Sequence, residues 1–207
     1  MDATDLLGDI RLMPVVELAD PDTAVPLAQA LLSAGINAIE VTLRTPQALT
    51  AIQNISTAVP QMLVGAGSVR QPEQFAQIQQ AGAQFAVSPG ATTTLLDGAD
   101  MPYIPGAATA SECLHLLQRG YQLQKFFPAE SLGGAGTIKA LAAPIQEVRF
   151  CPTGGINAAL LEQYFAVPAV ACVGGSWFVP ADLVAAAQFD EVERRAKDAI
   201  DQVNALI

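Results

Sequence analysis

Short apolar runs alternate along the chain with longer segments in which apolar residues recur at helical spacing. Runs that are apolar at nearly every position are typical of strands covered on both faces, as in parallel sheets. Eight strands are expected, at residues 12–16, 38–43, 62–65, 85–87, 103–104, 123–127, 147–151 and 169–173. Helices are expected between and after them, at residues 23–33, 46–57, 72–81, 92–97, 109–118, 136–141, 157–164, 180–187 and 190–205.

A strand followed by a helix, repeated eight times, predicts the α/β class and a (β/α)8 TIM barrel. The chain of 207 residues is short for such a barrel but long enough for one, and no linker divides it. We therefore expect a single domain over residues 1–207 that ends in a helix. A doubly wound open sheet is the alternative that the pattern alone leaves open.

The composition narrows the classes of partner. Hydrophobic residues make up 51% of the chain and charged residues 14%, so much of the sequence is expected to be buried. The net charge is −10, and the only cluster of basic residues lies in the last expected helix. Nucleic acids and anionic membrane surfaces are therefore poor candidates as partners, whereas a small-molecule substrate remains open.

The cysteines, the first residues and one uncharged stretch indicate in which part of the cell the protein is expected. Cys113, Cys151 and Cys172 form no C-x-x-C pair, which argues against a zinc site and a disulfide framework and favours the cytoplasm. The first residues lack the pattern of a signal peptide. The uncharged stretch 163–181 is long enough to resemble a membrane span, but its prolines and adjacent glycines favour a strand followed by a loop.

Candidate chemistry gathers at the carboxyl ends of the expected strands, which is where barrel enzymes build their sites. In AIEVTLRT, alternation places Glu40, Thr42 and Arg44 on one side of a strand. In QLQKFFPAE, Lys125 lies within an otherwise apolar strand. A buried lysine needs a partner, and a structural ion pair with Glu40 is one explanation for it.

A second explanation is catalytic, because lysine is the side chain that forms a Schiff base with a carbonyl. Its amine attacks only in the neutral form, which apolar walls and a nearby cation such as Arg44 favour. The other two lysines fall on expected helices, so Lys125 is the candidate for an imine. Glu40 could serve as general acid and base, and the guanidinium of Arg44 suits a substrate carboxylate.

Two glycine turns end the last two strands. Thr153, Gly154 and Gly155 form one, and the turn of residues 174–176, with Gly175 and Ser176, forms the other. Backbone N–H groups at these two places often hold a phosphate in barrels. His115 is the only histidine and falls within an expected helix, which removes support for a serine-histidine triad or a multi-histidine metal site. Trp177 is expected to be a packing residue.

The motifs EVTLRT, GAGSV, SPG, KFFPAE, PTGG and GGSW occur in this order between residues 40 and 177. Together they closely resemble the 2-keto-3-deoxy-6-phosphogluconate (KDPG) aldolase family, whose bacterial members commonly also act on 4-hydroxy-2-oxoglutarate (KHG). The resemblance implies a (β/α)8 barrel, usually a homotrimer, that works as a class I aldolase without metal or cofactor. It implies that KDPG is cleaved to pyruvate and glyceraldehyde 3-phosphate in the Entner-Doudoroff pathway.

The resemblance also implies roles for single residues. Lys125 would be the Schiff-base lysine, and Glu40 the general acid and base, acting with a water. Arg44 and Ser68 would hold the pyruvyl carboxylate, although the family more usually has threonine at the position of Ser68. The further residues implied are the phosphate-binding backbone of Gly154 and Gly155 with Ser176, and the apolar walls Pro89 and Phe127. The stretch SLGGAGTIKAL is slightly longer than the family's usual loop.

Three other functions compete with this interpretation. An aldolase of the same chemistry could prefer a different substrate, such as one that releases glyoxylate, or the galactonate epimer. A phosphosugar isomerase or epimerase on a related barrel would use Glu40 as a base and form no imine. A non-catalytic protein could keep the phosphate-binding turns alone, but Lys125, Glu40 and Arg44 together argue against that.

Overall fold

A computed structural model describes residues 2–207, which form nine strands, and every pair of strands in this range runs parallel. The strands are β1 (Leu12–Val16), β2 (Ala38–Thr42), β3 (Leu63–Gly67), β4 (Phe85–Val87), β5 (Tyr103–Ile104), β6 (Gly106–Ala107), β7 (Leu123–Phe126), β8 (Arg149–Pro152) and β9 (Val173–Gly175). The α/β class expected from the alternating pattern is confirmed.

The strands form two sheets in which neighbours in space are neighbours in the chain, except that β9, the last strand, pairs with β1, the first. A six-stranded sheet has the order β5-β4-β3-β2-β1-β9, and a three-stranded sheet has the order β6-β7-β8. A doubly wound fold reverses its strand order at a switch point, and no such reversal occurs among these nine strands. The doubly wound alternative is therefore wrong.

The expected single ring of eight strands is interrupted at two places in the hydrogen-bond pattern. β5 and β6 follow each other in the chain but belong to different sheets, and Pro105 between them has no N–H to donate. Between β8 and the segment of β9, only isolated bridges form, from Phe150 to Val170 and from Thr153 to Gly174. The ladder around the strands is thus continuous within each sheet and broken between them.

The strand positions differ from expectation mainly where glycine or proline is present. β3 extends further toward its carboxyl end than expected, through Gly67, whereas β9 begins at Val173, where the expected strand of residues 169–173 ends, and continues through Gly175. β8 includes Pro152, which the sequence pattern treats as a terminator. Each of these residues lies at the end of a strand, where a missing side chain or N–H disturbs the ladder least.

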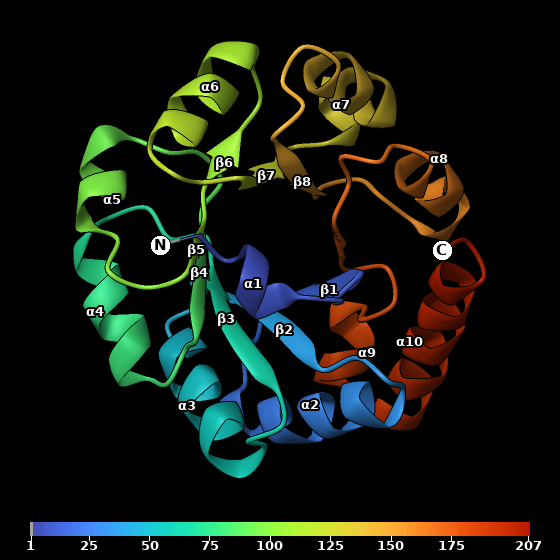
Figure 1. The fold of residues 1–207 in the computed structure, drawn as a ribbon. Helices are drawn as coiled ribbons and strands as arrows, with labels where there is room; N and C mark the ends of the chain where they lie inside the picture. The colour runs from blue at the N-terminus through green and yellow to red at the C-terminus, as the bar shows by residue number, and fades with distance from the viewer. Residues whose placement is uncertain (1) are drawn as a thin grey trace.

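Helices surround the strands in Figure 1, and the short helix α1 lies across the middle of that view. The helices are α1 (Thr4–Leu7), α2 (Ala24–Ser33), α3 (Ala48–Ala58), α4 (Glu73–Gln80), α5 (Thr93–Gly98), α6 (Ala110–Gln118), α7 (Gly134–Ala142), α8 (Leu161–Phe165), α9 (Ala181–Ala185) and α10 (Phe189–Asn204), with 3-10 turns η1 (Pro21–Thr23), η2 (Glu130–Leu132) and η3 (Ala158–Leu160).

Caps explain several helix starts. The hydroxyls of Thr92 and Thr109 accept hydrogen bonds from Leu95 N and Glu112 N at 3.3 Å each, which starts α5 and α6 at the expected places. α1 was not expected. Within residues 2–207 no helix is both long and apolar enough to cross a membrane.

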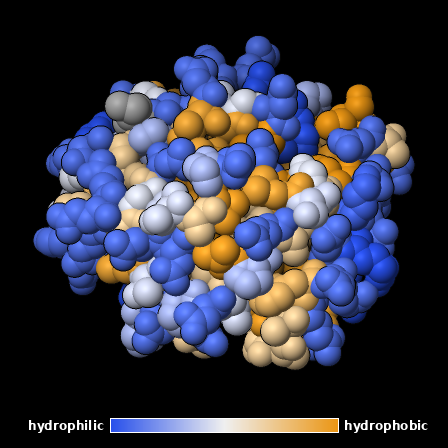
Figure 2. Space-filling view, turned by 90° about the horizontal axis from the view of Figure 1, so that it is seen from below, coloured by the Kyte–Doolittle hydropathy of each residue, from blue (hydrophilic) through white to orange (hydrophobic). Residues whose placement is uncertain are grey.

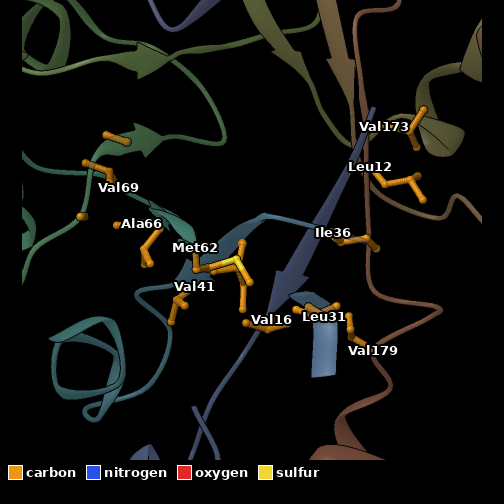
Figure 3. Close-up of a cluster of buried hydrophobic side chains, with 14 of the residues drawn as sticks. Leu12, Val16, Leu31, Ile36, Val41, Met62, Ala66, Val69, Val173 and Val179 are labelled. Atoms are coloured by element: carbon orange, nitrogen blue, oxygen red, sulfur yellow. The ribbon is translucent and has the colours of Figure 1, made fainter. Parts of the chain in front are cut away.

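The core lies between the sheets and the helices. Figure 3 shows part of it, where side chains such as Val16 from β1, Val41 from β2 and Leu31 from α2 belong to one buried cluster. On the outside, Figure 2 shows exposed hydrophobic groups among hydrophilic residues on one side of the molecule. The large hydrophobic residues with most exposure are Leu6, Leu114, Leu132, Leu206 and Ile207.

Candidate active site

A buried ion pair joins the two sheets at the centre of the site. Lys125 on β7 and Glu40 on β2 are only 5% and 1% exposed, and Lys125 Nζ lies 3.0 Å from Glu40 Oε1 and 3.4 Å from Oε2. The two residues are 85 positions apart in the sequence. The expected ion pair between these side chains is therefore present, and both of its members are almost fully shielded from water.

One glycine makes room for the carboxylate of this pair, and a second lets a neighbouring backbone segment approach the strand beside Lys125. A Cβ on Gly67 of β3 would lie 2.1 Å from Glu40 Oε1, so the carboxylate occupies the space that a side chain would fill. Gly106 of β6 pairs in register with Lys125, and a Cβ there would lie 2.4 Å from the carbonyl carbon of Pro89. A side chain at Gly67 would displace the Glu40 carboxylate, and one at Gly106 would collide with the backbone of Pro89 and Gly90.

The surroundings of Lys125 are apolar on one side and contain a thiol on another. Its Nζ lies 5.6 Å from the centroid of the Phe127 ring. Cys151 of β8 pairs in register with Lys125. A hydrogen bond from the Cys172 thiol lowers the pKa of Cys151, and the charge of Lys125 lowers it further, whereas the same hydrogen bond and burial raise the pKa of Cys172.

A cavity of about 610 Å³ opens at the carboxyl ends of the strands. Among its described lining residues, Arg44 is the one cation and Glu17 the one acid. The expected site residues that line it are Arg44, Phe127, Thr153, Gly154, Gly155, Gly175 and Ser176. The cavity therefore brings the end of β2 together with the ends of β7, β8 and β9.

Arg44 has a polar neighbour on each of two sides. Its Nε donates a hydrogen bond to Ser68 Oγ at 3.0 Å, and its Nη1 lies 3.9 Å from Glu17 Oε2. Ser68 has a φ of 59°, a left-handed conformation that costs a non-glycine residue about 1 kcal/mol or more. Strain of this kind at a site residue indicates that the surrounding structure holds the hydroxyl toward the guanidinium.

The turn after β8 offers backbone donors to the cavity. Gly154 and Gly155 have φ values of 106° and 80°, which only glycine adopts without strain. Within residues 2–207, the N–H groups of Gly154, Gly155 and Ser176 donate to no protein acceptor. N–H groups left unpaired beside a cavity can bind the oxygens of an anion, as expected for a phosphate.

Comparison with known proteins decides the family. The sequence profile described as "KDPG and KHG aldolase" matches residues 4–195. The KHG/KDPG aldolase of Escherichia coli (strain K12) is 45% identical over 202 residues, which is 96% of this chain and 95% of that protein. The chain belongs to the KDPG and KHG aldolase family.

Solved structures of this aldolase family have the same fold. The KDPG aldolase from Legionella pneumophila, described with pyruvate captured as a covalent carbinolamine intermediate, superposes with a TM-score of 0.91 at 41% identity, covering 94% of this chain and 96% of that one. The KDPG aldolase from Zymomonas mobilis ATCC 29191 superposes with a TM-score of 0.90 at 40% identity, covering all of both chains.

Four expected site residues lie outside the cavity lining of this aldolase-family chain. Lys125 and Glu40 are buried, and the Phe127 ring, whose centroid lies 5.6 Å from the amine, belongs to the lining. Ser68 reaches the cavity through Arg44, and Pro89 is exposed and packs beside Gly106. His115 lies on α6, and the described residues contain no cluster of three or more histidine, cysteine, aspartate or glutamate side chains that could hold a metal.

Two lining residues that bear on the chemistry of the cavity, Glu17 and Trp177, were not expected there from the sequence. Glu17 directly follows β1, so the rule that places sites at strand ends identifies it once the strand is recognised. Trp177 was expected only to pack; it does pack edge-on against Phe178 with ring centroids 4.7 Å apart, but it also lines the cavity. A Cβ on Gly175 would lie 1.8 Å from the Trp177 ring, so this glycine seats the indole.

Proposed function

We propose that this protein is a class I aldolase that cleaves KDPG reversibly to pyruvate and glyceraldehyde 3-phosphate and also acts on KHG. The observation that carries the proposal is the buried contact of 3.0 Å between Lys125 Nζ and Glu40 Oε1 beside a cavity with one cation and unpaired backbone donors. Relatives at 43–45% identity are named as aldolases for these substrates, which supports the same conclusion.

The substrate would bind along the cavity in one direction. Arg44 offers its remaining N–H groups to the pyruvyl carboxylate, because Ser68 already holds Nε. The phosphate at the other end would accept hydrogen bonds from the N–H groups of Gly154, Gly155 and Ser176. This arrangement brings the C2 ketone toward Lys125 and leaves the apolar ring of Phe127 beside the reacting carbons.

Catalysis would begin at the ion pair. Glu40 is close enough to take a proton from the Lys125 amine, which then attacks C2 to form a carbinolamine. The protonated Glu40 then gives this proton to the carbinolamine hydroxyl, which leaves as water, so Glu40 is again a carboxylate and the protonated imine can accept the electron pair of the C3–C4 bond. When Glu40 removes the proton of the C4 hydroxyl, that bond breaks and glyceraldehyde 3-phosphate leaves.

The remaining enamine takes up a proton at C3, and water hydrolyses the resulting imine to release pyruvate and free Lys125. Glu40 acts as base when it takes the proton of the amine, as acid when water leaves, and again as base in the cleavage step, so one carboxylate serves both directions of proton transfer. No metal ion and no cofactor take part in this sequence of steps. For KHG the same steps would release glyoxylate in place of the phosphorylated aldehyde.

We also propose that the two sheets form one (β/α)8 barrel in a single domain over residues 1–207. The sequential strand order, the bridge between Thr153 and Gly174, and the ion pair between β2 and β7 support closure of the ring. Exposed apolar residues support assembly, which we propose is a homotrimer. The three free cysteines support a cytoplasmic location. Molar mass from light scattering tests the trimer.

Borohydride trapping tests the chemistry. The protein is incubated with pyruvate, reduced and digested, and the added mass is located by peptide mass spectrometry. We expect the label on the peptide that contains Lys125 and none on peptides containing Lys139 or Lys197, the chain's other two lysines. Lys139→Arg is the matched control and should trap normally, whereas Lys125→Arg should trap nothing and lose turnover.

A folded protein that gains no label would contradict the imine mechanism. The phosphosugar isomerase or epimerase, with Glu40 as base and no imine, would then become the better explanation. Activity retained by Lys125→Ala would have the same meaning. Turnover of KDPG and KHG by the unmodified protein, followed by pyruvate release, separates the aldolase from a protein that only binds phosphate.

A further inference from the structure

Glu17 is an acid in a cavity that is expected to receive an anionic substrate. It is the only acidic residue among the described residues that line the cavity, and its side chain is 52% exposed. None of the aldolase steps derived above uses it. A carboxylate in this position repels anions, so its presence needs a reason that outweighs this cost.

Stabilisation of the fold does not supply that reason. Glu17 Oε2 and Arg44 Nη1 are 3.9 Å apart, and both side chains are half exposed, a geometry in which ion pairs contribute little. Orientation of Arg44 does not require it either, because Ser68 Oγ already accepts a hydrogen bond from Nε at 3.0 Å. The guanidinium can therefore leave Glu17 for a substrate carboxylate at small cost.

The sheet order shows which part of a substrate passes Glu17. β1 lies between β2 and β9, so its carboxyl end lies between Arg44 after β2 and Ser176 after β9. A substrate whose pyruvyl end is on Arg44 and whose phosphate is near Ser176 presents its middle carbons to the end of β1. In KDPG these carbons carry hydroxyls at C4 and C5, whereas in KHG C5 is itself a carboxylate.

We propose that Glu17 is a specificity-determining residue that favours a hydroxylated aldehyde over an aldehyde that carries a carboxylate. The inference rests on the proposed aldolase function and deepens it. A C5 hydroxyl can donate a hydrogen bond to the Glu17 carboxylate, while the C5 carboxylate of KHG meets a like charge. Both effects favour KDPG over KHG in the same enzyme.

The test compares the two substrates in Glu17→Gln, which keeps the shape of the side chain and removes its charge. We expect the ratio of kcat/KM for KDPG to that for KHG to fall by roughly tenfold, with the value for KHG rising, because a like-charge contact of a few ångströms is removed. Glu147→Gln on the exposed segment before β8 removes one charge far from the cavity and should leave the ratio unchanged.

Two results would overturn the inference. Glu17→Gln could leave both kcat/KM values unchanged, or it could change both by the same factor, as expected if Glu17 only positioned Arg44. The concentration of pyruvate that gives half-maximal borohydride trapping separates these, because loss of Arg44 positioning would raise it. Trapping at Lys125 in both proteins with an unchanged ratio rejects the role of Glu17 alone, whereas no trapping in the unmodified protein rejects the aldolase function.

Discussion

Gly67→Ala should remove activity by moving one carboxylate while leaving the fold in place. A Cβ on Gly67 would lie 2.1 Å from Glu40 Oε1 and 2.7 Å from Glu40 Cγ and Cδ, all side-chain atoms. Carbon and oxygen atoms without a bond between them stay more than about 3 Å apart, so the carboxylate must retreat by about 1 Å. Its contact with Lys125, now 3.0 Å, would then be lost or lengthened.

The size of the effect follows from that displacement. A misplacement of about 1 Å in a catalytic group costs roughly a hundredfold in rate, and we expect kcat/KM for KDPG to fall by about this factor. Overpacking a buried position typically costs about 1–3 kcal/mol of unfolding free energy. The protein should therefore stay folded but become less stable, and pyruvate should trap on Lys125 much more slowly.

The assay is pyruvate release under saturating and limiting substrate, together with denaturant unfolding. Gly136→Ala is the control, because a Cβ at Gly136 in α7 meets nothing within 4 Å and alanine favours a helix by about 1 kcal/mol. The control should keep full activity and gain stability. Full activity in Gly67→Ala would show that the position of Glu40 does not limit the reaction and would refute the reasoning.

Three further predictions concern strain, pH and thiol reactivity. Ser68→Gly relieves the strain of a φ of 59° but removes the hydroxyl that accepts a hydrogen bond from Arg44, so KM should rise several-fold while the free energy of unfolding changes by less than about 1 kcal/mol. Ala187→Gly is the control, because its φ of 53° lies outside the site, and it should leave KM unchanged. Equal KM values for Ser68→Gly and the unmodified protein would contradict this prediction. Hydrogen bonds from Arg194 and Arg195 lower the pKa of Glu191 from 4.5 to about 2. The unmodified protein should therefore melt at a higher temperature than Glu191→Gln, with the full difference above pH 4.5 and none as the pH falls toward 2. A difference in melting temperature that does not change with pH would contradict this. Burial raises the pKa of Cys113 to about 11, so an alkylating reagent at pH 8 should modify Cys113 in the unfolded protein but not in the native protein. Rapid alkylation of Cys113 in the native protein would contradict this prediction.

The sequence pattern predicted the strands because their side chains are buried on both faces. All five residues of β2 are buried, and it was expected one residue longer than it is. The bounds of β3 and β9 were predicted less accurately, because a glycine in the sequence indicates a turn even where the strand continues through it. In β3 the glycines are needed for packing: a Cβ on Gly65 would lie 2.2 Å from the Phe85 ring. That contact joins residues 20 positions apart and has no local signal.

The site was predictable to different degrees for similar reasons. Lys125 and Glu40 were found because charged residues inside apolar strands are costly unless paired. Their contact across two sheets could only be a hypothesis, since periodicity says which face a residue occupies and not what lies opposite. Glu17 and Trp177 were missed because a residue just beyond a strand follows the course of a loop, which the pattern of apolar positions does not describe.

The net negative charge of the protein disfavours binding of an anionic substrate, whereas the cavity contains groups that favour it. A net charge of −10 repels anions at long range, and the described lining of the cavity adds one cation and one acid. Attraction for an anionic substrate must therefore come from short-range contacts: the guanidinium of Arg44 and the unpaired N–H groups of Gly154 and Gly155. Contacts of this kind are directional, so they reward a substrate whose anionic ends have the right separation. Because Glu17 lies between them, the same arrangement penalises negative charge in the middle of the substrate, and selectivity follows from where charge is placed along the cavity.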